Sequence, residues 1–146
     1  MINVEIDKKI RMHTAEHILN QTMVRMFSCG RCFSAHIEKK KSKCDYHFDR
    51  NLSEKEVMEI EEKVNKIVKA GLEINESKIT LEEAGKMYNL KRLPEGAFDV
   101  RVIKVGDYDA CPCIGEHVKN SSEVGEFKII SNDYGDGVLR IRYKLD

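Results

Sequence analysis

Two pairs of potential metal ligands lie far apart in this sequence. His13 and His17 stand four residues apart in RMHTAEHIL, so a helix would project both imidazoles from one face. Such a pair can hold one metal ion, although a lone pair on an apolar helix more often belongs to the core. Cys113 and His117 repeat the spacing in CPCIGEHV, a segment that contains Pro and Gly. Thiolate and imidazole ligands favour zinc over magnesium or calcium, and the two pairs together predict a zinc site.

The first motif also fits another kind of enzyme. HTAEH satisfies the H-x-x-E-H pattern of inverted zinc peptidases, in which Glu16 would act as the general base. That interpretation requires a further acidic metal ligand and a peptide-binding cleft. It gives Cys113 and His117 no role, and we keep it as an alternative.

A non-catalytic interpretation uses the cysteines alone. Cys29 and Cys32 form a C-x-x-C pair that, with Cys111 and Cys113, would complete a structural zinc site in a small nucleic-acid-binding module. The second pair is C-x-C, which fits such a site less well. This alternative also leaves His13 and His17 without a function.

Length and composition indicate a single domain over residues 1–146. A chain of 146 residues can bury a sizeable core, and 41% hydrophobic with 34% charged residues is typical of a globular protein. No apolar run approaches the ~20 residues of a transmembrane helix, and MINVEIDKKI lacks a signal-peptide core. Five cysteines without an export signal favour reduced thiols or metal ligands over disulfides, and hence a cytoplasmic protein.

Charge is balanced overall but unevenly distributed. The net charge is zero, whereas residues 1–50 contain ten Lys and Arg against six Asp and Glu. One basic run suits a phosphate backbone, and equally the solvated tip of a hairpin; it comprises Lys39, Lys40, Lys41 and Lys43. Further candidates for phosphate contacts are Lys8, Lys9 and Arg11. A net charge of zero permits modest binding of a nucleic acid in one orientation and excludes tight non-specific binding.

Hydrophobic periodicity predicts an α+β domain in which helices pack on an antiparallel sheet. Val4 and Ile6 indicate a short first strand, and a largely apolar helix is expected over residues 8–27. A second helix should begin at the capping box of Ser53 and Glu56 and end at Gly71. The other expected elements are a short helix starting at Thr80 and strands over residues 31–38, 44–49, 72–79, 99–105, 126–131 and 138–145, with residues 132–137 as the last turn.

Both ligand motifs resemble those of a known family. HTAEHIL and PCIGEHVKNSSEVGEFKII look like the editing domain of alanyl-tRNA synthetase and its free-standing relatives, the AlaX proteins, which are close to this chain in size. The similarity runs from about residue 7 to residue 143. It implies the α+β fold of the alanyl- and threonyl-tRNA synthetase editing domains. It also implies four zinc ligands, namely His13, His17, Cys113 and His117.

The resemblance further implies an activity, the hydrolysis in trans of the ester bond of mischarged tRNA(Ala). Seryl-tRNA(Ala) is the first expected substrate and glycyl-tRNA(Ala) the second, because an apolar synthetase pocket cannot strongly reject a gained hydroxyl or a lost methyl group. The partner would be the acceptor end of the tRNA, contacted by the lysine run. Neither a membrane nor an obligate protein partner is expected.

Two carboxylates are candidates for the chemistry of such a site. Glu16 and Glu116 are placed to move a proton or to bind the ammonium group of the substrate. Glu116 departs from the family pattern, which usually has threonine before the second histidine, and Cys111 is a second departure. Four protein ligands close a zinc site, whereas a catalytic zinc keeps one position open. Whether Cys113 ligates or leaves that position open is not decided by the sequence.

Overall fold

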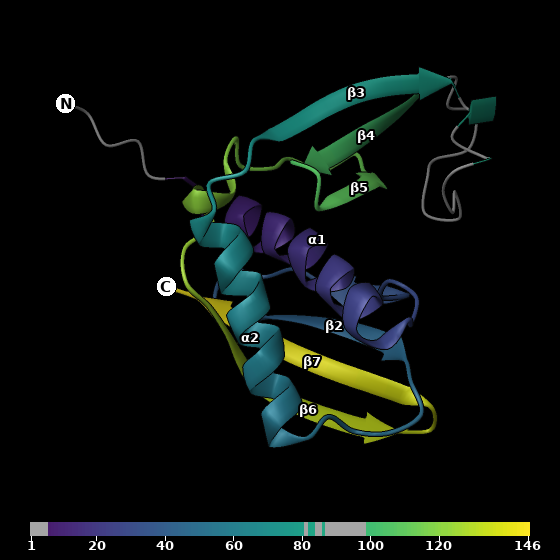
Figure 1. The fold of residues 1–146 in the computed structure, drawn as a ribbon, viewed down its shortest axis with the longest axis vertical. Helices are drawn as coiled ribbons and strands as arrows, with labels where there is room; N and C mark the ends of the chain where they lie inside the picture. The colour runs from purple at the N-terminus through teal and green to yellow at the C-terminus, as the bar shows by residue number, and fades with distance from the viewer. Residues whose placement is uncertain (1–5, 81, 84–85, 87–98) are drawn as a thin grey trace.

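The computed structural model describes residues 6–80, 82–83, 86 and 99–146, and its strands form two antiparallel sheets (Figure 1). The larger sheet has the strand order β1-β2-β7-β6 and the smaller has β3-β4-β5. The elements are α1 (Lys8–Phe27), β1 (Ser34–His36), β2 (Ser42–His47), α2 (Glu54–Lys69), β3 (Ile74–Thr80), β4 (Asp99–Val105), β5 (Asp109–Pro112), the 3-10 helix η1 (Ser121–Glu123), β6 (Phe127–Gly135) and β7 (Val138–Leu145). The predicted α+β fold with antiparallel strands is confirmed, although its strands divide into two sheets.

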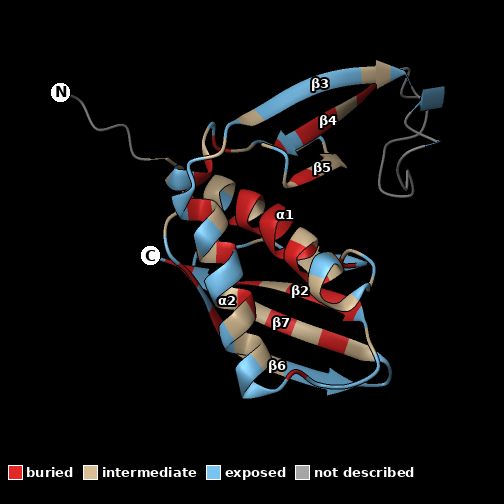
Figure 2. Ribbon diagram, viewed as in Figure 1, coloured by how far each residue is buried: buried red, intermediate tan, exposed pale blue. Residues whose placement is uncertain are grey.

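Helix α1 lies between the two sheets and contacts α2, β7 and β5. Its N-cap is Asp7, whose carboxylate accepts a hydrogen bond from the Lys9 amide. It ends at Ser28, whose backbone is left-handed with a φ of 56°. The middle turns of α1 are buried (Figure 2), as expected for a helix that is apolar around most of its circumference.

Helix α2 packs beside α1 and against β6. The Ser53 hydroxyl accepts a hydrogen bond from the Glu56 amide, and the Glu56 carboxylate accepts one from the Ser53 amide, which confirms the predicted capping box. The buried stripe of the helix consists of Ile60, Val64 and Val68. Among the described residues, no helix is long and apolar enough to cross a membrane.

The last hairpin turns later and more tightly than predicted. Strand β6 continues to Gly135, so the chain reverses over Asp136 and Gly137 alone. Both residues have positive φ angles, 51° and 77°, as a two-residue turn that matches the twist of its strands requires. The prediction of a turn over residues 132–137 is therefore wrong in length, because strand pairing extends through most of that segment.

Other boundaries also differ from the predicted ones. Strand β1 covers three residues of the predicted 31–38, β2 begins at Ser42 rather than at residue 44, and β5 was not predicted. Of the first strand predicted at Val4 and Ile6, Val4 lies outside the described residues and Ile6 belongs to no strand. Most of the helix predicted after Thr80 also lies outside the described residues. The Thr80 hydroxyl does accept a hydrogen bond from the Glu83 amide, as a helix cap would.

The main core fills the space between the two helices and the larger sheet. Its largest fully buried side chains include Tyr46, Tyr143 and Phe127. The Tyr46 hydroxyl donates to Oδ1 of Asn20 at 2.7 Å, and the Tyr143 hydroxyl donates to the carbonyl oxygen of Met12 at 3.0 Å. Because both hydroxyls are satisfied by α1, the core fixes the position of that helix against the sheet.

Candidate metal centre

The two predicted ligand pairs meet in space. Helix α1 presents His13 and His17, and the segment after β5 presents Cys113 and His117. One ligand atom from each side chain lies within 4.8 Å of every other. Sγ of Cys113 is 3.3 Å from Nε2 of His13 and 3.5 Å from Nε2 of His117. Within the described part of the chain, these four residues are the only group of three or more His, Cys, Asp or Glu so arranged.

These separations match the ligand geometry of zinc. Bonds of about 2.0–2.1 Å to imidazole nitrogen and 2.3 Å to thiolate sulfur place tetrahedral nitrogen and sulfur ligands about 3.5 Å apart. The two distances from Sγ of Cys113 agree with that value. Cys113 therefore lies within the cluster rather than set back from it, and the donor set and spacing fit a zinc ion.

Hydrogen bonds fix which nitrogen of two imidazoles faces the cluster. Nδ1 of His13 lies 3.1 Å from the backbone carbonyl oxygen of Glu116. A carbonyl oxygen can only accept, so Nδ1 donates this hydrogen bond, and Nε2 is the nitrogen that faces Cys113. A histidine that binds a metal through one nitrogen usually donates the N–H of the other to a carbonyl or carboxylate, which is the arrangement of His13.

Thr14 sets the corresponding tautomer of His117. Its hydroxyl oxygen lies 3.0 Å from Nδ1 of His117, accepts a hydrogen bond from the Val118 amide, and lies 3.3 Å from the carbonyl oxygen of Ile10. The hydroxyl has one proton, which the Ile10 carbonyl can accept, and its lone pairs can accept from both Val118 and His117. All these groups are satisfied when Nδ1 of His117 is protonated and Nε2 faces the cluster.

Asp109 orients the third imidazole from a buried position. Its Oδ2 lies 3.6 Å from Nδ1 of His17, which has no closer hydrogen-bond partner among the described residues. The Asp109 carboxylate also accepts hydrogen bonds from Arg31, at 2.6 and 3.2 Å, and from Gln21 at 2.9 Å. A carboxylate behind a metal-binding histidine fixes the ring and makes it a stronger ligand.

The electrostatics of this group agree with that arrangement. Burial opposes ionisation of Asp109, but the adjacent imidazole of His17 and the charge of Arg31 lower its pKa to about 2. Burial by itself would lower the pKa of His17, yet the neighbouring Asp109 carboxylate and Cys113 sulfur raise it to about 9. The two anionic neighbours of His17 thus favour positive charge at this position, which a bound cation would also supply.

Cys113 and His117 are in the protonation states that a metal requires. Burial disfavours a thiolate, but the imidazoles of His117, His13 and His17 lower the pKa of Cys113 to about 3. Burial lowers the pKa of His117 to about 4, so its ring is neutral at pH 7. A thiolate and a neutral imidazole are the forms that bind zinc.

A glycine and an arginine shape the segment that carries these ligands. A Cβ atom at Gly115 would lie 2.6 Å from Nδ1 of His13 and closer still to Cε1, so the absence of a side chain makes room for the ring. Arg101, on β4, donates to the Gly115 carbonyl oxygen at 2.6 Å and to the Glu76 carboxylate at 2.7 Å. The smaller sheet thereby holds the segment against α1.

The two predicted catalytic carboxylates differ in their surroundings. Glu16 precedes His17 on α1, is 4% exposed, and forms no hydrogen bond with the described residues. Glu116 is exposed, and its observed contact with the cluster is made by its backbone carbonyl. The four predicted lysines do not join the cluster but line a separate pocket.

The cysteine-only alternative is not supported by the arrangement of the thiols. Among the described residues, Cys29, Cys32 and Cys111 join no group that could hold a metal. The Cys29 thiol donates to the carbonyl oxygen of Met23. Cys32 is buried next to Cys44, and a hydrogen bond between their thiols raises the pKa of Cys44.

Comparisons with known proteins agree with the motifs. Residues 100–142 match the family described as the threonyl and alanyl tRNA synthetase second additional domain. The chain is 32% identical to an alanine–tRNA ligase of Caldicellulosiruptor saccharolyticus and 34% identical to that of Alkaliphilus metalliredigens, in each case over 96% of this chain. The enzyme of Staphylothermus marinus is 31% identical over 92% of it.

The chain spans only a small part of these relatives, 17% of the first two and 15% of the third. The aligned part nevertheless includes nearly the whole chain and both ligand pairs. The resemblance seen in the motifs is thus confirmed, and the chain belongs to the editing-domain family of the alanyl-tRNA synthetases.

Proposed function

We propose that this protein hydrolyses, in trans, the ester bond of mischarged tRNA(Ala), with seryl-tRNA(Ala) as its first substrate and glycyl-tRNA(Ala) as its second. The observation that carries the proposal is the convergence of His13, His17, Cys113 and His117 around one point. The similarity to alanine–tRNA ligases supports a deacylase acting on tRNA.

We further propose that zinc is the cofactor and that these four residues hold it. When bound there, zinc would supply Lewis-acid chemistry towards water or the ester carbonyl. Thr14 and Asp109 would keep His117 and His17 in the orientation that ligation needs. An aminoacyl ester is activated compared with an amide, so a positioned water and a stabilised oxyanion are enough for its hydrolysis.

Glu16 is our candidate for proton transfer. It precedes His17 on α1, the residue as a whole is only 4% exposed, and its carboxylate makes no hydrogen bond to the described residues. A carboxylate in such a position can accept a proton from an attacking water or bind the ammonium group of the substrate. The exposed Glu116, whose backbone is already tied to His13, is the second candidate for the ammonium group.

The test offers the purified protein seryl-, glycyl- and alanyl-tRNA(Ala), with and without a metal chelator. We expect serine to be released faster than alanine and the activity to be lost on chelation and restored by zinc. Equal rates for serine and alanine would refute the substrate, and activity that is indifferent to chelation would refute the cofactor.

Paired variants separate the proposed zinc site from its cysteine-only alternative. Cys113→Ala should abolish both zinc binding and hydrolysis, whereas Cys29→Ala, outside the cluster, should retain both. Glu16→Gln should lower kcat while the zinc content stays at one equivalent. Loss of zinc in Cys29→Ala would instead support the structural zinc site, and full activity of Glu16→Gln would remove that residue from the mechanism.

A further inference from the structure

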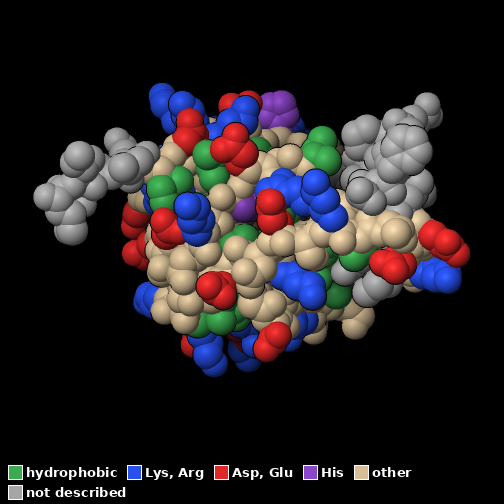
Figure 3. All heavy atoms as spheres, turned by 90° about the horizontal axis from the view of Figure 1, so that it is seen from above, with side chains coloured by type: hydrophobic (Ala, Val, Ile, Leu, Met, Phe, Trp, Pro, Cys, Tyr) green, Lys and Arg blue, Asp and Glu red, His purple; other side chains and the backbone are tan. Residues whose placement is uncertain are grey.

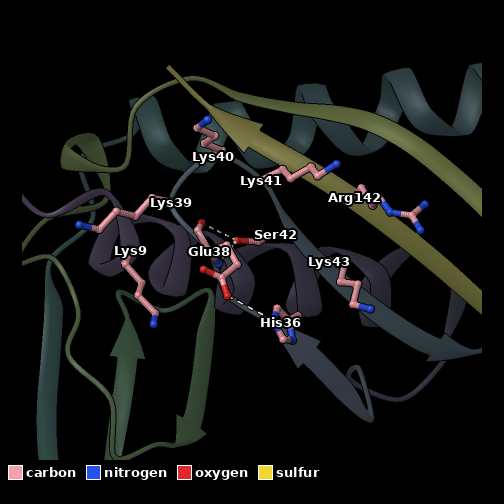
Figure 4. A pocket seen from close by; sticks show the side chains of 9 residues that line it. All are labelled: Lys9, His36, Glu38, Lys39, Lys40, Lys41, Ser42, Lys43 and Arg142. Atoms are coloured by element: carbon pink, nitrogen blue, oxygen red, sulfur yellow. Dashed lines mark hydrogen bonds and ion pairs between the residues drawn. The ribbon is translucent and has the colours of Figure 1, made fainter.

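A basic pocket of about 600 Å³ opens at the loop between β1 and β2 (Figure 4). Its lining comes from α1, β1, β2, β7 and the loop itself, and comprises Lys9, His36, Glu38, Lys39, Lys40, Lys41, Ser42, Lys43 and Arg142. Six of these side chains are Lys or Arg and one is a carboxylate. By contrast, Figure 3 shows basic and acidic side chains mixed on one face of the protein, as its zero net charge leads one to expect.

Most of the positive charge in this pocket is not neutralised by the protein. Lys39 pairs with Asp7 at 3.7 Å, and Arg142 pairs with Asp133. The carboxylate of Glu38 is engaged by His36 at 3.2 Å. Within the described residues, no carboxylate lies within 4 Å of the ammonium groups of Lys9, Lys40, Lys41 and Lys43. Like charges gathered in this way favour the binding of a polyanion.

The loop that carries three of these lysines is held in shape by a buried hydroxyl. Ser42 is 2% exposed. Its hydroxyl accepts a hydrogen bond from the Glu38 amide at 3.0 Å and donates one to the Glu38 carbonyl oxygen at 3.1 Å. The loop over residues 38–42 is therefore closed by one side chain, which fixes the backbone that carries these lysines before any ligand binds and lowers the entropic cost of binding.

The pocket is close to the proposed reaction centre. Lys9 and His13 are four residues apart on α1, so they share a face and are separated by about 6 Å along the helix axis. A substrate whose ester lies at the cluster would place the phosphates of its last nucleotides near Lys9. The chain leading to them would continue towards Lys41 and Lys43.

We infer that this pocket binds the sugar-phosphate backbone at the acceptor end of tRNA, next to the nucleotide that carries the ester. The inference rests on the proposed function for the identity of the polyanion, and it assigns Lys9 and Arg142 to the same binding surface as the lysines of the loop. Contacts to phosphates position a nucleic acid without reading its sequence. The pocket therefore sets the register of the acceptor end, while the cluster acts on the ester.

The test measures the affinity for deacylated tRNA(Ala) as a function of salt concentration. The pocket variant carries Lys40→Gln, Lys41→Gln and Lys43→Gln. The control variant carries Lys63→Gln, Lys66→Gln and Lys69→Gln, which remove the same charge from exposed positions of α2. Each lost phosphate contact lowers the slope of log affinity against log salt by about 0.7–0.9. We expect the pocket variant to lose about two units of slope and at least tenfold in affinity, and the control to lose neither.

Two further measurements separate geometry from charge. Ser42→Ala keeps every charge of the pocket but frees the loop, so it should weaken tRNA binding while the salt slope changes little. Equal slopes and equal affinities in the two triple variants would overturn the inference. A second contrary result would be a pocket variant that still binds tRNA but has lost binding to anionic lipid vesicles, while the control variant keeps it. Because deacylated tRNA requires no hydrolysis, absence of deacylation would refute the proposed function without touching this result.

Discussion

Gly115→Ala tests the metal centre through a single added methyl group. The new Cβ would lie 2.6 Å from Nδ1 of His13, whereas ordinary van der Waals contact begins at 3.4 Å. Either the imidazole or the backbone must therefore move by about 1 Å. The backbone is held by Arg101, which donates to the Gly115 carbonyl oxygen, and by the Cys113 amide, which donates to the Arg101 carbonyl oxygen. The imidazole is the group that has to move.

A displacement of that size is large for a metal ligand. Zinc–ligand distances tolerate about 0.2 Å, so a shift of about 1 Å removes His13 from the ligand set and breaks its hydrogen bond to the Glu116 carbonyl. Mutations that disturb only the support of a ligand typically cost 10–100-fold in metal affinity. For Gly115→Ala we expect at least the upper end of this range, equivalent to about 3 kcal/mol.

The assay is competition for zinc against a chromophoric chelator, with the thermal melting point of the metal-free protein as a check of folding. Gly30→Ala is the matched control, because a Cβ at that glycine meets nothing within 4 Å. It should bind zinc as the wild type does. A Gly115→Ala protein that folds and binds zinc with unchanged affinity would refute the assignment of His13 as a ligand.

Three other predictions follow from the contacts around the site and the helices. Asp109→Asn should weaken zinc binding by 10–100-fold, because Asp109 supports His17. It should also lower the free energy of unfolding by about 3 kcal/mol, because it leaves the Arg31 guanidinium unpaired. The control Asp133→Asn, at an exposed ion pair, should lower the free energy of unfolding by less than about 1 kcal/mol. Hydrogen bonds from Arg50 and the Ser53 amide lower the pKa of Glu56 to about 2. Their contribution to the free energy of unfolding should therefore be complete above pH 4.5 and be lost as the pH falls towards 2. In Glu56→Gln, the free energy of unfolding should lack this pH-dependent contribution. Removal of zinc should speed amide hydrogen exchange over residues 113–118 and leave β2, β6 and β7 protected; uniform acceleration would contradict this local role.

The four residues of the cluster were predictable because their signal is local. Imidazoles four residues apart on a helix share a face whatever the rest of the fold, and thiolate with imidazole is a recognisable zinc donor set. The supporting residues have no such signal. Asp109 is 88 residues from Gln21 and 78 from Arg31, and only the packing of β5 against α1 brings them together. In the sequence, nothing distinguishes Asp109 from any other aspartate at the start of a short strand, so its role in the site could not be predicted.

The fold was predictable where one local signal dominated. The capping box of α2 and its buried stripe agree with the structure, because both depend on residues within one or two turns. The last turn was predicted too long because Asn132, Asp133 and Gly135 favour turns, whereas cross-strand pairing with β7 keeps them in β6. Strand β5 was not predicted because DACP is short and ends in proline, and its order comes from pairing with β4.

The division into two sheets explains how the centre is assembled. The larger sheet and the two helices form most of the main core, to which the smaller sheet adds Val105 and Ile74, whereas Val100 and Val102 of the smaller sheet form a separate cluster. Polar contacts, rather than burial alone, therefore join the segment with Cys113 to α1: the Val118 amide donates to the Thr14 hydroxyl, and the Gln21 amide donates to Asp109. A bound metal would add four bonds between the same two parts. The site thus doubles as the connection between the helix and the smaller sheet, so that loss of any one ligand should loosen the segment after β5 before it affects the core.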